Sequence, residues 1–221
     1  MKNLLKKTTD KIINFYKPQI KDDLFQEAEK VFKQYLKKSK YEEYLKFSES
    51  IFYNYQLKSE YNVEKHVYLM IHYGLTKHKN DLNFNKDAYI IACFFHDIGR
   101  LIFCDINEPR DKHKEKSLEI FKKEFGFAIP EKMKDVIESC ILEHSGERIT
   151  NKNYAELLTI READRISLMQ INSKDASFGI KTDDYDPFYW FNFHYKDFMK
   201  NLNPSKYALN IVQKLKKKIN N

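Results

Sequence analysis

The sequence predicts an all-α fold for a chain of 221 residues. Gly and Pro number only five each, whereas all-β folds need many turns, and turns need these two residues. Hydrophobic residues make up 42% of the chain and charged residues 32%, which suits amphipathic helices with one packed and one solvated side. Apolar residues also recur with the helical period along most of the sequence. We therefore expect long helices joined by short loops.

The first sixty residues are predicted to form helices that cover the rest of the molecule. One helix is expected from about Asp22 to Lys38, where apolar residues form a stripe of helical period. The next is expected to begin at Ser39, which has the capping-box spacing with Glu42. No chemistry is apparent in this region. Residues 1–60 are therefore predicted to be an N-terminal extension or cover, and residues 61–221 the main domain with its C-terminal helices.

Two helices with buried histidines are predicted next. The first runs from about Val63 to His78 and carries His66 on its apolar side. The second runs from Lys86 to Asp97, is capped by Asn85 and is apolar nearly all round, which predicts a central, buried helix. Gly99 is expected to stop this helix at its carboxyl end.

Three more helices are predicted to point polar residues inward. The helix from about Lys112 to Phe125 has His113 on its inward stripe, and the following one has His144. The helix from about Tyr154 to Met169 turns Asp164 to the same side as its apolar residues. The remainder is expected to form one or two helices, the last of them starting at Pro204. The aromatic segment from Phe188 to Phe193 is expected to be core rather than a dimer surface.

The pair His96-Asp97 stands at the end of the most apolar helix, and this position suggests a metal site. A buried carboxylate without a partner is costly, and a divalent ion is the best partner for two adjacent ligands of this kind. His66 and Asp164 fall on inward faces of other helices. A single inward histidine is more often a core residue, but the whole set is hard to explain that way. The other three histidines are expected to be surface or interhelix polar residues: His72, His78 and His194.

The spacing of these residues resembles the HD-domain superfamily of metal-dependent phosphohydrolases. His66 is followed about thirty residues later by Phe95-His96-Asp97-Ile98-Gly99-Arg100, which is similar to the central motif of that family. The segments around His113 with Ser117, Ile141 to Ser145, and Ala163 to Ile166 resemble its other blocks. The resemblance covers about Tyr61 to Met169 and leaves the first sixty residues outside.

The resemblance implies an HD-domain-like helical bundle with a metal in a central cleft, held by His66, His96, Asp97 and Asp164. Nitrogen and carboxylate ligands without thiolate suit Mn, Fe, Co, Ni or Zn. His113 and His144 match positions that bind a second metal in some branches and face substrate phosphate in others. The sequence leaves one ion or two open, and with two ions Asp97 would bridge them.

The expected activity is hydrolysis of a phosphate ester or anhydride by a metal-activated water, with a nucleotide as the expected substrate class. Asp97, His113, His144 and Arg100 are the candidate catalytic residues. Arg148 and Arg165 are further candidates for binding the phosphoryl group, and a surface or helix-pairing role is an equal alternative for each arginine. Motifs of guanosine-tetraphosphate and dNTP triphosphohydrolases are not evident, which disfavours those substrates.

The sequence also bears on the alternative functions and on the location of the protein in the cell. The alternative function is a non-catalytic metal- or nucleotide-binding regulatory module with the HD fold. The formal charge of +7 is compatible with anionic substrates or with nucleic acid, but the abundance of Lys and Asn along the whole chain explains it better as a compositional bias. The sequence also lacks a clustered basic face with interleaved aromatics, which argues against nucleic-acid binding. Three cysteines without a Cys-x-x-Cys pair, and no apolar run of about eighteen residues, predict a cytoplasmic protein without a membrane span. The oligomeric state is not predicted.

Overall fold

The computed structural model describes residues 23–59, 63–102, 112–146, 154–171 and 187–219, without the side chains of residues 187–189. Every regular element in these ranges is helical and none is a strand, which confirms the predicted all-α class. The elements are α2 (Asp23–Leu36), α3 (Glu42–Gln56), α4 (Glu64–Lys77), α5 (Lys86–Phe95), the 3-10 helix η1 (Ile98–Leu101), α6 (Lys112–Glu124), α7 (Glu131–Glu143), α8 (Ala155–Gln170), α9 (Pro187–Asn201) and α10 (Lys206–Ile219).

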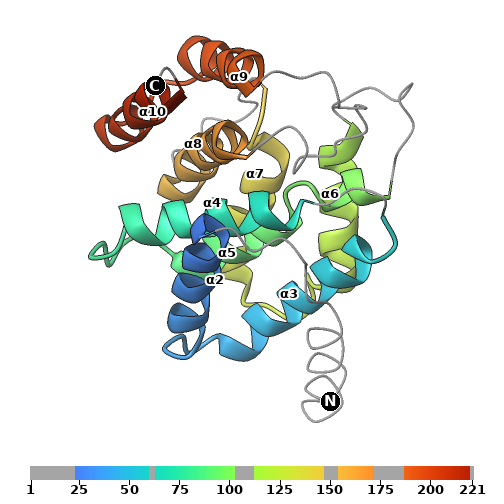
Figure 1. Cartoon of the computed structure of the whole chain (residues 1–221). Coiled ribbons are helices and arrows are strands. Elements are labelled where there is room, and N and C mark those ends of the chain that lie inside the picture. The colour runs from blue at the N-terminus through green and yellow to red at the C-terminus, as the bar shows by residue number, and fades with distance from the viewer. Residues whose placement is uncertain (1–22, 60–62, 103–111, 147–153, 172–186, 220–221) are drawn as a thin grey trace.

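Helix α5 is the centre of the molecule, as its sequence predicts. Its residues from Ala88 to Phe95 are all buried, and the Asn85 side chain caps its start by accepting from the Ala88 amide at 3.1 Å. Helices α3, α4, α6, α7 and α8 pack around it (Figure 1). A helix that is apolar on every side is stable in water only when others enclose it. This arrangement brings the carboxyl end of α5 to a point where several helices meet.

Helices α2 and α3 pack into the same hydrophobic core as the helices that follow them. Helix α2 packs on α4, and α3 packs on α5 and η1. Phe32 of α2 and Phe52 of α3 both meet Phe94 of α5, with ring centroids 5.7 Å apart in each pair. The two helices therefore pack on α4, α5 and η1, whereas the role of residues 1–60 as a cover and their division from residues 61–221 stay predictions.

The predicted capping box at Ser39 is wrong. The Ser39 hydroxyl accepts a hydrogen bond from the Tyr41 amide at 2.9 Å and donates one to Asp87 at 2.6 Å. Helix α3 begins after Tyr41, without a side-chain cap. The partner that decides this geometry is Asp87, which lies 48 positions further along the chain. Short-range spacing alone does not reveal such a partner.

Gly99 is not the C-terminal stop that the sequence suggests. Helix α5 ends at Phe95, Gly99 lies inside η1, and only Gly146 among the described glycines has a positive φ, of 75°. A Cβ atom at Gly99 would lie 2.3 Å from the carbonyl oxygen of His113. The Gly99 amide also donates to the Ser117 hydroxyl at 2.9 Å. Gly99 is therefore needed for the close approach of η1 to α6.

The C-terminal helices pack against α8 at one end of the bundle (Figure 1). Trp190 and Phe191 are buried, which confirms the core prediction for them, whereas Phe193 is 51% exposed and contradicts it. Its exposure follows from helical geometry, because two positions along a helix of 3.6 residues per turn turn the side chain to about the opposite side from Phe191. The side chains of the first two aromatic residues of this segment lie outside the described part. None of the described helices has the length and apolarity that crossing a membrane requires.

Candidate metal centre

The structure brings together all six side chains that the sequence singles out around the HD motif. They come from α4, α6, the end of α7, α8 and the two residues that follow α5, and each is buried or nearly buried. They fall into two groups of three whose nitrogen and oxygen atoms lie within 4.8 Å of one another. The first group is His66, His96 and Asp164, and the second is Asp97, His113 and His144.

The first group has the spacing of ligands around one ion. Nε2 of His66 lies 3.1 Å from Nε2 of His96 and 3.4 Å from Oδ1 of Asp164. Two atoms that are each about 2.1 Å from a metal, at an angle of about 90° to 110°, lie about 3.0 to 3.4 Å apart. A donor set of two imidazoles and a carboxylate therefore fits a divalent metal in both chemistry and spacing.

The backbone fixes which ring nitrogen of two histidines faces the centre. Nδ1 of His96 lies 2.8 Å from the carbonyl oxygen of Cys93, and Nδ1 of His144 lies 2.8 Å from that of Ile141. A carbonyl oxygen only accepts, so Nδ1 carries the proton and donates in both residues. The lone pair of each neutral imidazole is then on Nε2, which points into the cluster and is available to a ligand.

Ser167 orients His66 in the same way, and the sequence did not single it out. Its hydroxyl donates to the backbone carbonyl of Asp164 at 2.9 Å and lies 2.7 Å from Nδ1 of His66. Because the hydroxyl proton is used, the oxygen accepts from Nδ1–H, and Nε2 of His66 keeps its lone pair. Ser167 stands one helical turn after Asp164, so its spacing offered a signal once Asp164 was taken as a ligand.

Asp97 stands between the two groups. Its Oδ1 lies 3.1 Å from Nε2 of His113 and 3.4 Å from Nε2 of His144, and those two nitrogens are 3.4 Å apart. Its other oxygen, Oδ2, lies 3.7 Å from Nε2 of His96 in the first group. The predicted four-residue ligand set is therefore divided in space, with Asp97 turning one oxygen toward each half.

Arg100 belongs to the second group. Its Nε donates to Oδ1 of Asp97 at 2.8 Å, and Nη2 donates to Nε2 of His113 at 3.3 Å. The arginine side chain is 34% exposed, so this side of the cluster borders solvent. A fixed cation beside an opening is suited to contact an anionic group that enters from outside.

Arg165 supports the opposite side of the cluster. It donates through Nη1 to Oδ2 of Asp164 at 2.6 Å and pairs through Nε with Asp197 of α9. It therefore orients the carboxylate of Asp164 from behind, with Oδ1 left toward His66. Arg148, the third arginine that the sequence suggested, lies outside the described residues.

The electrostatics leave the cluster in the protonation states that a metal requires. Burial lowers the pKa of His96 to about 3 against the opposing effect of Asp97, so this imidazole is neutral at pH 7. Burial alone would raise the pKa of Asp97 and Asp164. The charges of Arg100 and Arg165 nevertheless hold both pKa values well below the usual range, so both carboxylates are ionised.

Arg161 of α8 holds the end of α7 in place. Its guanidinium donates to the carbonyl of Glu143 at 2.5 Å and to that of Gly146 at 2.6 Å. These carbonyls flank His144, and the last carbonyls of a helix otherwise lack partners within it. Arg161 therefore helps to place His144 against Asp97.

Two of the remaining histidines lie away from the cluster in interhelix positions. His78 contacts Asp81 and Thr159 at 3.1 and 2.9 Å and stacks on the ring of Phe84. His72 is partly buried and within the electrostatic reach of Glu27. Both fit the expectation of polar residues between helices, and His194 is described below.

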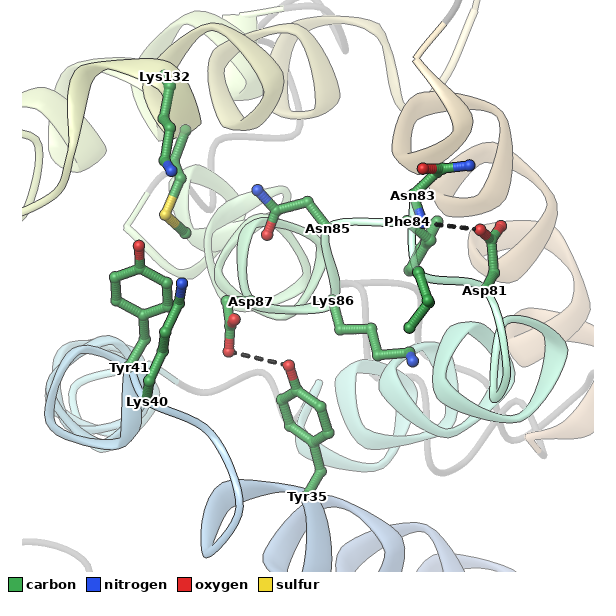
Figure 2. A pocket seen from close by; sticks show the side chains of 12 residues that line it. Tyr35, Lys40, Tyr41, Asp81, Asn83, Phe84, Asn85, Lys86, Asp87 and Lys132 are labelled. Atoms are coloured by element: carbon green, nitrogen blue, oxygen red, sulfur yellow. Dashed lines mark hydrogen bonds between the residues drawn. The ribbon is translucent and has the colours of Figure 1, made fainter.

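A surface cleft of about 390 Å³ lies at the other end of α5 (Figure 2). Tyr35, Asn85 and Asp87 line it, and the Tyr35 hydroxyl donates to Asp87 at 3.0 Å. The cleft meets the amino end of α5, whereas His96 and Asp97 follow its carboxyl end. It is therefore separate from the metal centre, and none of the six clustered residues lines it.

A comparison with protein families agrees with this geometry. The model of the HD domain matches residues 63–169, a range that contains all six clustered residues. HD domains bind divalent metals, and the family consists in general of metal-dependent hydrolases. No curated protein matches the chain, and no solved structure does. Residues 63–169 of the chain are therefore an HD domain.

Proposed function

We propose that this protein is a metal-dependent phosphohydrolase that cleaves a phosphate ester or anhydride of a small molecule, with a nucleotide as the substrate class. The observation that carries the proposal is the cluster of four imidazoles and two carboxylates inside an HD domain. The ring nitrogens that face this cluster keep their lone pairs because the opposite nitrogens of three histidines are used for hydrogen bonds. The net charge of +7 is compatible with an anionic substrate.

The proposed metal site holds one ion, bound by His66, His96, Asp164 and one oxygen of Asp97. The short separations within the first group and the approach of Asp97 Oδ2 to His96 support this set. Mn, Fe, Co, Ni and Zn all suit such nitrogen and oxygen donors. When bound, a divalent ion of this kind supplies a Lewis acid for the phosphoryl group and lowers the pKa of a coordinated water.

The second group is proposed to bind the phosphoryl group of the substrate rather than a second ion. Arg100 already donates to both Asp97 and His113 there, so another cation would lie against the guanidinium. Arg100 is proposed to balance the negative charge of the phosphoryl oxygens, with His113 and His144 beside it. Asp97 turns one oxygen toward each group and is proposed to align the phosphoryl group with the metal ion.

Turnover by the purified protein tests this function. We expect release of phosphate or pyrophosphate from at least one member of a panel of nucleoside mono-, di- and triphosphates, cyclic nucleotides and dinucleotides, assayed with Mn, Co, Ni, Fe and Zn. Replacing Asp164 by Ala should abolish both metal binding and turnover, whereas the matched variant Asp135→Ala, on α7 and outside the cluster, should keep both. Full activity in Asp164→Ala, or in the presence of EDTA, would contradict the proposal.

The alternative regulatory function has its own signature in the same assay. A non-catalytic module would bind a metal or a nucleotide and release no product under any metal. Binding by calorimetry without turnover across the whole panel would therefore favour that alternative over hydrolysis.

A further inference from the structure

Helix α9 lies outside the matched HD range, yet it packs directly against the helix that carries Asp164. Two contacts fix it there. Nε1 of Trp190 donates to the carbonyl of Leu168 at 2.7 Å, and Asp197 pairs with Arg165. Trp190 and Asp197 are seven positions apart, which is two helical turns, so they share one face of α9. This face packs on α8, the helix that carries Asp164, and one of its partners is Arg165, which donates to Asp164.

His194 lies on that face, four positions after Trp190 and three before Asp197. Its side chain is 7% exposed, and its ring packs on that of Trp190 with centroids 4.4 Å apart. Its Nε2 atom is fully buried and has no hydrogen-bond partner in the part of the chain that the structure describes. Buried polar atoms in folded proteins nearly always have a partner, so an atom of this kind points to a missing ligand.

The surroundings of His194 show where such a ligand lies. Burial and the charge of Arg165 lower the pKa of His194 to about 4, Asp164 and Asp197 oppose this effect, and His66 lowers it further. His194 is therefore within electrostatic reach of two members of the first group. It is not itself part of either group of potential metal ligands. A neutral imidazole that is close to the metal centre but outside it is placed to contact what the metal binds.

We propose that Nε2 of His194 donates a hydrogen bond to an oxygen of the phosphorylated substrate held at the metal centre. Helix α9 is then a wall of the substrate site, and His194 is a substrate-binding residue that the HD motif does not contain. This inference rests on the proposed phosphohydrolase function. Its ligand is a phosphoryl oxygen, since an anionic acceptor compensates a buried N–H better than a neutral one.

Two substitutions of His194 separate binding from packing. His194→Phe keeps a ring of similar shape and removes the donor, whereas His194→Gln keeps an N–H donor at a similar reach. The probe is inorganic phosphate, titrated by calorimetry into the metal-loaded protein, together with KM for the best substrate of the panel. We expect His194→Phe to raise the Kd for phosphate and the KM for the substrate about tenfold or more, as loss of a hydrogen bond to a charged group does. His194→Gln should stay within about threefold of the wild type.

The metal content of each variant distinguishes a failure of the proposed function from a failure of the proposed role of His194. It should be equal in the wild type, in both His194 variants and in the control His72→Phe, which changes a histidine of α4 away from the cluster. A wild type without metal or turnover would overturn the proposed function. An active wild type with unchanged phosphate binding in His194→Phe would overturn only the role of His194. An unchanged Kd with a lower Tm would identify His194 as a merely structural residue.

A measurement on the wild type covers the case in which His194→Phe fails to fold. In a ¹⁵N-labelled, zinc-loaded sample, the Nε2 resonance of His194 should shift when phosphate is added, while that of His72 should not. An unmoved His194 resonance at a phosphate concentration that saturates the calorimetric signal would overturn the proposal.

Discussion

At the scale of single residues, the candidate centre depends on hydrogen bonds that set histidine tautomers. His96 and His144 each donate from Nδ1 to a carbonyl three residues earlier in their own chain segment, so local geometry alone orients them. His66 depends instead on Ser167 of another helix. The sequence predicted the six clustered residues because their types and spacing resemble a known motif. It did not predict Ser167, because the position of this serine one helical turn after Asp164 acquires a role only when His66 packs against the same helix.

Removing the hydroxyl of Ser167 should weaken metal binding more than folding. Ser167→Ala takes away the acceptor for Nδ1 of His66, which then no longer has a fixed tautomer. Loss of such a supporting contact typically costs about 10- to 100-fold in metal affinity. The matched control is Ser48→Ala on α3, whose hydroxyl also donates to a carbonyl three residues earlier but lies outside the cluster. Competition with a chelator measures the effect, and equal metal affinity in the two variants would refute it.

At the scale of elements, helix existence was predicted well and helix ends were predicted less well. The central helix was evident from its continuous apolar run, since burial on all sides leaves a strong pattern. The errors at Ser39 and Gly99 have a common cause. Each residue has a partner distant in sequence, Asp87 for the first and the backbone of α6 for the second. Likewise, nothing in the sequence of α9 reveals that its Trp190 face packs beside Asp164, because that placement is tertiary.

The close contact of η1 with α6 predicts that Gly99 cannot be replaced without loss of stability. In Gly99→Ala the added Cβ would meet the backbone oxygen of His113 at 2.3 Å, and a backbone atom cannot swing aside. We expect a loss of about 1 to 3 kcal/mol in the free energy of unfolding, with displacement of His113 and reduced turnover. In Gly126→Ala the nearest atom, Cα of Lys122, is 3.1 Å away, so the cost should be smaller. Urea unfolding measures both, and a Gly99→Ala protein as stable as the wild type would disprove the close approach.

At the scale of the whole molecule, a buried polar network joins the α3 cover to the helix of His66. The Tyr68 hydroxyl donates to Glu49, the Tyr53 hydroxyl donates to Glu64 at 2.6 Å, and the two hydroxyls are 3.2 Å apart. Burial raises the pKa of Glu49 to about 7, although Tyr68 lowers it. The sequence does not predict this network, because its members come from two helices and meet only when α3 and α4 pack together.

Glu49 should make the stability of the protein depend on pH. Its carboxyl keeps a proton in the folded state up to about pH 7 but loses it near pH 4.5 in the unfolded state. The folded state therefore binds the extra proton, and stability falls as pH rises from about 4.5 to 7. Glu49→Gln removes this dependence, so the variant should gain up to about 3 kcal/mol relative to the wild type across that range. Urea unfolding at pH 5, 6, 7 and 8 measures the difference, and a difference independent of pH would contradict it.

One divalent ion is proposed to bind among His66, His96, Asp97 and Asp164 of the HD domain. The most direct test is calorimetric titration of the metal-free protein with Mn or Zn, followed by elemental analysis of the washed complex. We expect one ion per chain in the wild type, a higher Tm in the loaded protein, and loss of both in His66→Ala. Two equivalent ions per chain would contradict the single-ion site, and the absence of any bound ion would contradict the metal centre itself.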